Sequence, residues 1–201
     1  MKISSAVEIC NLALTRIDQN TISSLTPDTL QGRKCALVYE QCKTSLLSQY
    51  PWSFAIQNAK LNKLTTTGVS EYKYKFSLPE GFLRVVTLMD ANYAVLPPLQ
   101  GIKKMYALEG GFLFSDAPEL ILKFVSDVDN VAQFSPLFID SLKLSIAIEL
   151  TKMFNSSATY LQQLMAEFST IISKATTVDC QQSVLRPITQ YPLLSKYRSA
   201  I

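Results

Sequence analysis

The stretch Tyr72-Lys73-Tyr74-Lys75-Phe76-Ser77-Leu78 decides the fold class, because its apolar and aromatic residues recur at every second position. This period of two is typical of a β-strand that turns one face to a core and the other to solvent. The residues after it predict further strands at 83–89, 105–108, 112–114 and 120–125, with a hairpin turn at Glu109-Gly110-Gly111. We therefore expect a small antiparallel β-sheet over about residues 71–126.

On both sides of this region the apolar residues follow a helical period of three to four. Capping signals mark the predicted helix starts: Ser5 with a glutamate three residues later, Thr26 before a proline, and Ser135 before a proline. Four helices are predicted, at about residues 5–18, 27–50, 136–154 and 157–176.

Together these elements predict an α+β fold. The N-terminal and C-terminal helix pairs are expected to form a helical bundle, with the small antiparallel β-sheet inserted between them. A single domain then spans residues 1–180, and an extended C-terminal arm follows at residues 181–201.

Composition limits the chemistry that is open to this chain. Its 201 residues are 48% hydrophobic and carry 19 basic and 16 acidic side chains, for a net charge of +3. There is no histidine, so Ser-His-Asp and Cys-His nucleophiles and metal sites built on imidazole are excluded within one chain. An enzyme would have to use carboxylates, lysine or tyrosine.

Four cysteines occur without a C-x-x-C pair, and we expect all four to be small buried residues in a reducing compartment. We expect no targeting segment and no membrane anchor, because no apolar run reaches the length of a membrane span. The protein is therefore expected to be made and kept in a cytoplasm.

Four acidic residues of the predicted sheet region are candidates for a carboxylate pair that cleaves glycosidic bonds. They are Glu71, Glu80, Glu109 and Glu119. Sequence spacing does not test the distance between their carboxyl groups, and solvated carboxylates at strand edges and turns are the commoner arrangement.

Other motif-like segments lack residues, or a structural context, that the chemistry of the motif requires. Asp127-Val128-Asp129-Asn130 begins like a calcium loop, but Ala132 and Phe138 stand where glycine and glutamate are required. Ser70 and Lys73 match S-x-x-K at a strand start rather than on a helix, and the glycines form no phosphate-binding motif. We assign no catalytic, cofactor-binding or metal-ligating residue.

The segment Pro51-Trp52-Ser53-Phe54-Ala55 holds the only tryptophan. Two interpretations are open. Trp52 and Phe54 anchor the helix pair onto the sheet, or Trp52 lies at the centre of a subunit interface, where tryptophan is favoured.

The last 21 residues carry three basic side chains and no acidic one. Pro187 and Pro192 prevent a continuous helix, and the segment is too apolar for a solvated tail. We expect a docking arm for a partner, with packing against the helices of its own subunit as the alternative. The expected interface residues are Arg186, Tyr191, Leu193, Leu194, Lys196, Tyr197 and Arg198.

Three segments carry a family resemblance. They are Ile9-Cys10-Asn11-Leu12-Ala13-Leu14-Thr15-Arg16-Ile17, Ile22-Ser23-Ser24-Leu25 and Tyr50-Pro51-Trp52-Ser53-Phe54-Ala55. They resemble the N-terminal half of tail tubular protein A, the head-to-tail adaptor of short-tailed bacteriophages. Tyr72-Lys73-Tyr74, Leu78-Pro79, Phe82-Leu83-Arg84-Val85 and the stretch from Ser135-Pro136 to Leu150 follow in the same order. The resemblance covers about 175 residues.

The resemblance implies a structural role in the neck of a virion that is assembled in the host cytoplasm. Such adaptors form a ring, generally of twelve subunits, that joins the portal protein to the tail nozzle protein and lets double-stranded DNA pass without sequence-specific contact. The C-terminal arm would then meet the portal or a neighbouring subunit. No cofactor and no enzymatic activity are implied. The alternative is a cell-wall hydrolase that uses carboxylates, because some relatives have wall-degrading activity.

Overall fold

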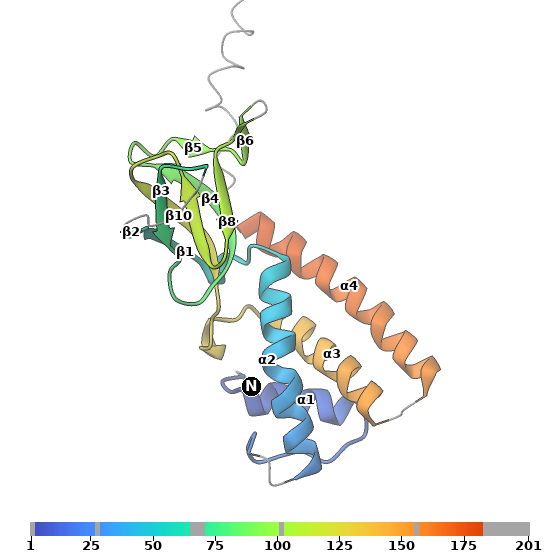
Figure 1. The fold of residues 1–201 in the computed structure, drawn as a ribbon. Coiled ribbons are helices and arrows are strands. Elements are labelled where there is room, and N and C mark those ends of the chain that lie inside the picture. Colours follow the sequence, from blue (N-terminus) through green and yellow to red (C-terminus); the bar gives the residue numbers. More distant parts are fainter. Residues whose placement is uncertain (1–2, 27–28, 65–70, 101–102, 155–156, 183–201) are drawn as a thin grey trace, which may run out of the picture.

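The structure is a computed structural model that describes residues 3–26, 29–64, 71–100, 103–154 and 157–182. Its four α-helices are α1 (Ala6–Arg16), α2 (Leu30–Gln49), α3 (Pro136–Met153) and α4 (Ala158–Gln182). Two short 3-10 helices, η1 (Ser53–Ala55) and η2 (Val131–Gln133), lie on the paths into and out of the β region. Figure 1 shows the helices gathered at one end of the molecule and the strands at the other.

Side-chain caps fix where three of the helices begin, because each satisfies a backbone N–H group that has no partner inside the helix. Ser5 accepts from the Glu8 N–H at 3.2 Å, and Ser135 accepts from the Phe138 N–H at 3.3 Å. In α2 the cap is Thr29, which accepts from the Gly32 N–H at 3.0 Å, so this helix begins later than the predicted residue 27.

The helices share one large hydrophobic core. Leu14 of α1, Leu46 of α2 and Phe138 of α3 are fully buried in it. Leu164 and Ala175 of α4 pack against the same core from one face of that helix. The helical end of the molecule, which we call the helical unit, is therefore held together by non-directional apolar burial.

Within the described residues, ten strands form the other end. They are β1 (Ile56–Lys60), β2 (Lys63–Leu64), β3 (Tyr74–Ser77), β4 (Phe82–Asp90), β5 (Val95–Leu96), β6 (Leu99–Gln100), β7 (Lys103–Lys104), β8 (Tyr106–Glu109), β9 (Phe112–Ser115) and β10 (Leu120–Ser126). Two four-stranded antiparallel sheets have the orders β1-β10-β4-β5 and β2-β3-β9-β8, and β6 and β7 form a separate two-stranded ribbon.

The two four-stranded sheets share a second hydrophobic core, to which both contribute buried residues. These are Leu61, Phe76, Leu88, Leu113, Leu120, Leu122 and Phe124. Leu88 and Leu122 come from the first sheet and Leu113 from the second, so the sheets pack face to face. We call this two-sheet unit, residues 56–126, the sandwich.

The predicted fold class is wrong in its arrangement. The helices do not form a bundle around a small sheet: the inserted region is two four-stranded sheets with a core of their own, and it stands beyond the end of the helices (Figure 1). It begins at Ile56 rather than at about residue 71, because two strands precede the predicted sheet. They are β1, which reads Ile-Gln-Asn-Ala-Lys, and β2, which has only two residues. Neither strand carries an apolar alternation that predicts a buried face.

The sandwich joins the helical unit through its first and last strands. Ile56 of β1 pairs with Val125 of β10, and Val125 is buried in the helical core. Arg84 of β4 donates to the carbonyls of Ser48 and Gln49 at 3.3 and 3.2 Å, where α2 ends with unpaired carbonyl groups. The two units are thus tied by backbone pairing, apolar packing and a charged donor at a helix end.

None of the helices that the structure describes is both long enough and apolar enough to span a membrane.

Candidate assembly surface

The outer face of the second sheet carries aromatic side chains outside both cores. Phe112 and Phe114 alternate along β9 and belong to neither hydrophobic cluster. In the register, Phe114 lies opposite Lys75 of β3, and Lys75 lies opposite Leu64 of β2. Directly opposed residues share a face of the sheet, so these four side chains form one surface, which we call the aromatic–lysine face.

Lys75 lies over this aromatic pair. Its ammonium nitrogen is 3.6 Å from the ring centroid of Phe112 and 5.8 Å from that of Phe114. Such cation–π contacts contribute about 0.5–1 kcal/mol at exposed sites. Two partly exposed phenylalanines on the face opposite the core are typical of an interaction surface, where aromatic residues are enriched.

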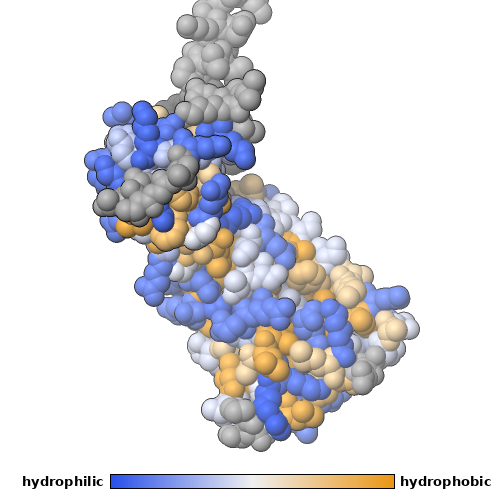
Figure 2. Space-filling view, in the orientation of Figure 1, coloured by the Kyte–Doolittle hydropathy of each residue, from blue (hydrophilic) through white to orange (hydrophobic). Residues whose placement is uncertain are grey.

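A groove of about 720 Å³ opens at the end of the sandwich that faces the helices. Its walls are the β3–β4 loop, the β8–β9 hairpin and Asp127. Gly110 and Gly111 both have left-handed φ angles, +57° and +80°, which lets the hairpin turn tightly and sets Glu109 opposite Phe112 on the groove wall. In Figure 2 apolar residues reach the surface at this end of the sandwich.

Next to this groove a buried lysine is surrounded by carboxylates. Lys43 of α2 is only 1% exposed, and its ammonium group binds Glu40 at 2.8 Å, Asp127 at 3.2 Å and Asp129. Burial alone acts to lower the pKa of Lys43, but the hydrogen bonds to the three carboxylates outweigh it and hold that pKa above its ordinary value. Three carboxylates share one ammonium, so two negative charges remain near the groove.

Two carboxylates of the segment 127–130, which begins like a calcium loop, belong to this cluster. Asp127 and Asp129 bind the chain's own cation, Lys43. In the described part of the chain, no group of three or more His, Cys, Asp or Glu side chains is placed to hold a metal ion.

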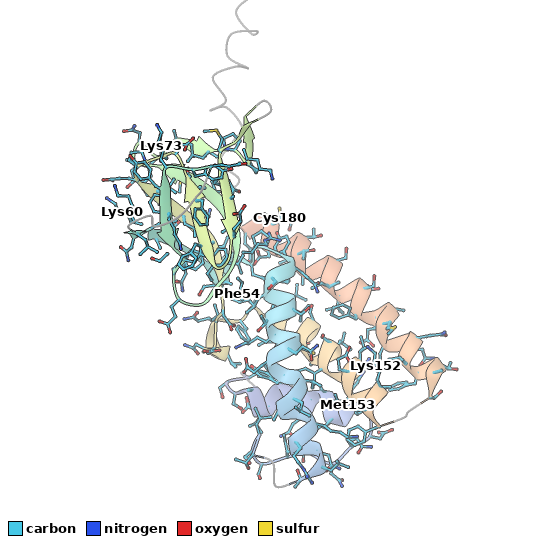
Figure 3. All side chains as sticks on the ribbon, in the orientation of Figure 1. Phe54, Lys60, Lys73, Lys152, Met153 and Cys180 are labelled. Carbon is cyan, nitrogen blue, oxygen red and sulfur yellow. The ribbon has the colours of Figure 1, made fainter. Side chains whose placement is uncertain are left out.

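The segment around Trp52 is an anchor, and it anchors the helices. Trp52 is 0% exposed, and its Nε1 donates to the Leu46 carbonyl at 2.9 Å. Its ring meets that of Phe138 edge-on, with centroids 5.0 Å apart. The tryptophan therefore packs on α2 and α3, in the core that also includes Val125 of β10, and its buried ring leaves no exposed surface for a subunit contact. Phe54, labelled in Figure 3, lies where the sandwich meets the helices.

Asp179 of α4 completes this anchor. Its buried carboxylate accepts from the Ser53 N–H at 3.0 Å and from the Ser53 hydroxyl at 2.7 Å, which ties α4 to the start of η1. A buried carboxylate requires such donors, since an unpaired buried charge is very costly.

The groove is not lined by all four candidate carboxylates of the sheet region. Glu71 and Glu80 are exposed, and Glu119 binds Lys60 at 2.8 Å. Glu109 alone lines the groove, with Asp127 as the second carboxylate there. The carboxylate pair of this groove therefore includes a residue that the sequence analysis considered only as part of a calcium motif.

The predicted interface residues Arg186, Tyr191, Leu193, Leu194, Lys196, Tyr197 and Arg198 lie outside the described residues, as does Ser70 of the S-x-x-K motif. The cysteine prediction is wrong for one residue. Cys10, Cys35 and Cys42 are buried, but Cys180 is exposed near the end of α4.

Sequence reasoning missed Lys43 and the aromatic–lysine face. A signal for Lys43 existed: it stands four residues before Leu47 and four after Tyr39, on the buried side of α2. A lysine on an apolar helical stripe predicts a buried ion pair, because an ammonium group is rarely buried alone.

A scan against models of known protein families finds no match for this chain, and a search of curated proteins finds no significant match.

Proposed function

We propose that the protein is a structural head-to-tail adaptor, similar to tail tubular protein A of short-tailed bacteriophages. In this role it forms a ring, of about twelve subunits by the resemblance, in the neck of the virion. The ring joins the portal protein to the tail nozzle protein. Double-stranded DNA passes through it with weak, salt-sensitive contact only, because a subunit with a net charge of +3 neutralises few phosphates.

The observation that carries the proposal is the aromatic–lysine face. Phe112 and Phe114 lie on an outer sheet face, and Lys75 covers them only in part. Both sheets also end in edge strands, β1 and β5 in one and β2 and β8 in the other. Outer aromatic faces and sheet edges are surfaces through which subunits associate, and a heterologous contact between such surfaces builds a ring when the rotation closes.

The test is the mass of the particle that forms when the protein is mixed with the portal protein of the same phage. We expect a closed ring on the portal, measured by mass photometry and by electron cryomicroscopy. Replacing Phe112 and Phe114 by serine should prevent the ring. Leu37→Ser is the matched control, because Leu37 is also an exposed apolar residue but lies on α2, outside both sheets. A one-to-one complex without a ring would contradict the proposal.

A second candidate is a cell-wall hydrolase, and the groove is the observation that favours it. Glu109 and Asp127 line the same groove, and two carboxylates on a groove wall are the minimum for glycoside cleavage. A turnover assay on purified peptidoglycan tests it. Hydrolysis that disappears in Glu109→Gln and persists in Glu119→Gln would support this second function.

A further inference from the structure

The groove between the β8–β9 hairpin, the β3–β4 loop and Asp127 combines two kinds of surface. Leu78, Phe82, Leu83 and Phe112 supply apolar walls. Glu109 and Asp127 supply carboxylates. A ligand that fits this groove has large apolar groups and positive charge close together.

Among the described residues, the groove carboxylates are not fully paired with cations. The carboxylate of Glu109 makes no ion pair or hydrogen bond there. Asp127 shares the single ammonium of Lys43 with Glu40 and Asp129, whose side chains are 64% and 88% exposed. The groove is therefore acidic as well as apolar, and its volume of about 720 Å³ is in the range of pockets that hold several side chains.

We propose that this groove binds the chain's own C-terminal segment, residues 191–198. The segment reads Tyr-Pro-Leu-Leu-Ser-Lys-Tyr-Arg and has no acidic residue. Leu193, Leu194 and Tyr197 match the apolar walls, and Lys196 and Arg198 match Glu109 and Asp127. Charge and apolar complementarity thus lie within one stretch of eight residues.

The position at which the described chain ends fits this occupant. α4 ends at Gln182, at the end of the helical unit that faces the sandwich, near Cys180 in Figure 3. From Asp179 a chain of contacts leads to the groove: Asp179 binds Ser53, Ile56 pairs with Val125, and Asp127 follows two residues later. Eight residues, 183–190, separate Gln182 from Tyr191, and a chain of that length spans at most about 29 Å.

Occupation by the same chain is favoured over occupation by another molecule because the segment is tethered. Covalent linkage gives two segments of one chain an effective concentration of about 1 mM when the residues between them can span the distance, above that of any free partner at ordinary protein concentrations. One consequence rests on the proposed adaptor function. The free subunit would hold its docking residues in its own groove until a portal protein competes for them.

The test uses the full chain, without a portal, so a failure to form rings does not affect it. A carbodiimide joins a carboxyl group to a lysine amine in direct contact, with loss of one water. We expect an amide between Lys196 and Glu109 or Asp127, detected by mass spectrometry of peptides. Mixing protein of natural isotopic composition with protein labelled with ¹⁵N shows whether the amide forms within one chain.

Amides that join only peptides of the same label support the proposal. Amides that join labelled to unlabelled peptides would show that a second copy fills the groove, and this would overturn it. An amide between Lys196 and Glu119 at equal yield would overturn it too, because Glu119 lies at the opposite end of β10 from Asp127.

Hydrogen exchange supplies an independent measurement. We expect the backbone of residues 108–112 to exchange about tenfold faster in Glu109→Lys or Lys196→Glu than in the unmodified protein, since the pair then repels. Combining both substitutions should restore slow exchange, and Glu119→Lys should leave it unchanged. Equal exchange in all five proteins would overturn the proposal.

Discussion

The helical unit and the sandwich differ in how much of each is core. Among the described residues, 28 buried apolar residues belong to the helical core and seven to the core between the sheets. Hydrophobic stabilisation scales with buried apolar area, so the helical unit carries most of the folding free energy. The sandwich instead presents the aromatic–lysine face and the acidic groove. In this protein the unit with the smaller core carries the candidate binding surfaces.

The largest effect is expected from a substitution in the helical core. Trp52→Ala should lower the free energy of unfolding by about 4 kcal/mol, because it leaves a cavity among Tyr50, Phe54 and Phe138 and removes the hydrogen bond to Leu46. Urea denaturation followed by circular dichroism measures this loss. A loss below about 1 kcal/mol would show that the helical unit is not the main source of stability.

A smaller and more local effect is expected in the sandwich core. Leu113→Ala should cost about 3 kcal/mol, and the cost should appear as faster hydrogen exchange in the strands while the helices stay protected. Leu108→Ala is the control, since Leu108 lies on the neighbouring strand but is 44% exposed. Equal acceleration in helices and strands would mean that the two units unfold as one.

The hydrogen bonds between Asp179 of α4 and Ser53 of η1 fix the segment that leads into the sandwich, and removing them measures their contribution to stability. Asp179→Ala leaves the Ser53 N–H and hydroxyl without their acceptor and should cost about 2 kcal/mol. Thermal unfolding measures the change, and Thr177→Ala on the exposed side of α4 serves as the control. If Asp179→Ala were as stable as this control, water would be replacing the carboxylate without cost.

The smallest effect, which is absent at neutral pH, is expected from a tyrosine. Burial, only partly offset by the nearby Lys43 ammonium, raises the pKa of Tyr39 to about 12 from an ordinary value of 10. The folded state therefore holds this proton more tightly than the unfolded state. The resulting stability is complete below pH 10 and is lost as the pH rises from 10 to 12.

Tyr39→Phe should weaken that alkaline loss of stability, as measured by urea denaturation between pH 8 and 12. Burial also raises the pKa of Tyr106, in the sandwich. Tyr106→Phe is therefore the matched comparison between the two units. An unchanged pH profile in Tyr39→Phe would contradict the assignment.

The helices could be predicted from the sequence because local patterns, a cap and a helical period, mark them. Ser5 and Ser135 cap the helices that their patterns predict, and a helical period over many residues leaves little ambiguity. The sandwich could be predicted only in part. β3 alternates visibly, but β1 is recognisable only through its pairing with β10, a contact between residues 65 or so positions apart.

The candidate surfaces were harder still. Phe112 and Phe114 alternate as any strand residues do, and only the fold shows that Leu113 between them faces the core while they face outward. The acidic groove likewise depends on a hairpin and a distant loop meeting in space. Of the two groove carboxylates, Glu109 is a candidate for catalysis from the sequence. Nothing in the sequence around Glu109 indicates that Asp127 lies beside it.

The pairing of Ile56 with Val125 places the two ends of the sandwich side by side, about 5 Å apart. An insert whose ends lie together leaves the host chain almost undisturbed, and such sites tolerate the exchange of whole domains. The residues between these ends can therefore be exchanged for another module, provided that it replaces the contacts that Leu83, Arg84 and Val86 make with the helical unit. The same helical scaffold can present different modules to different partners, and an engineer can graft a foreign hairpin or sheet at this junction.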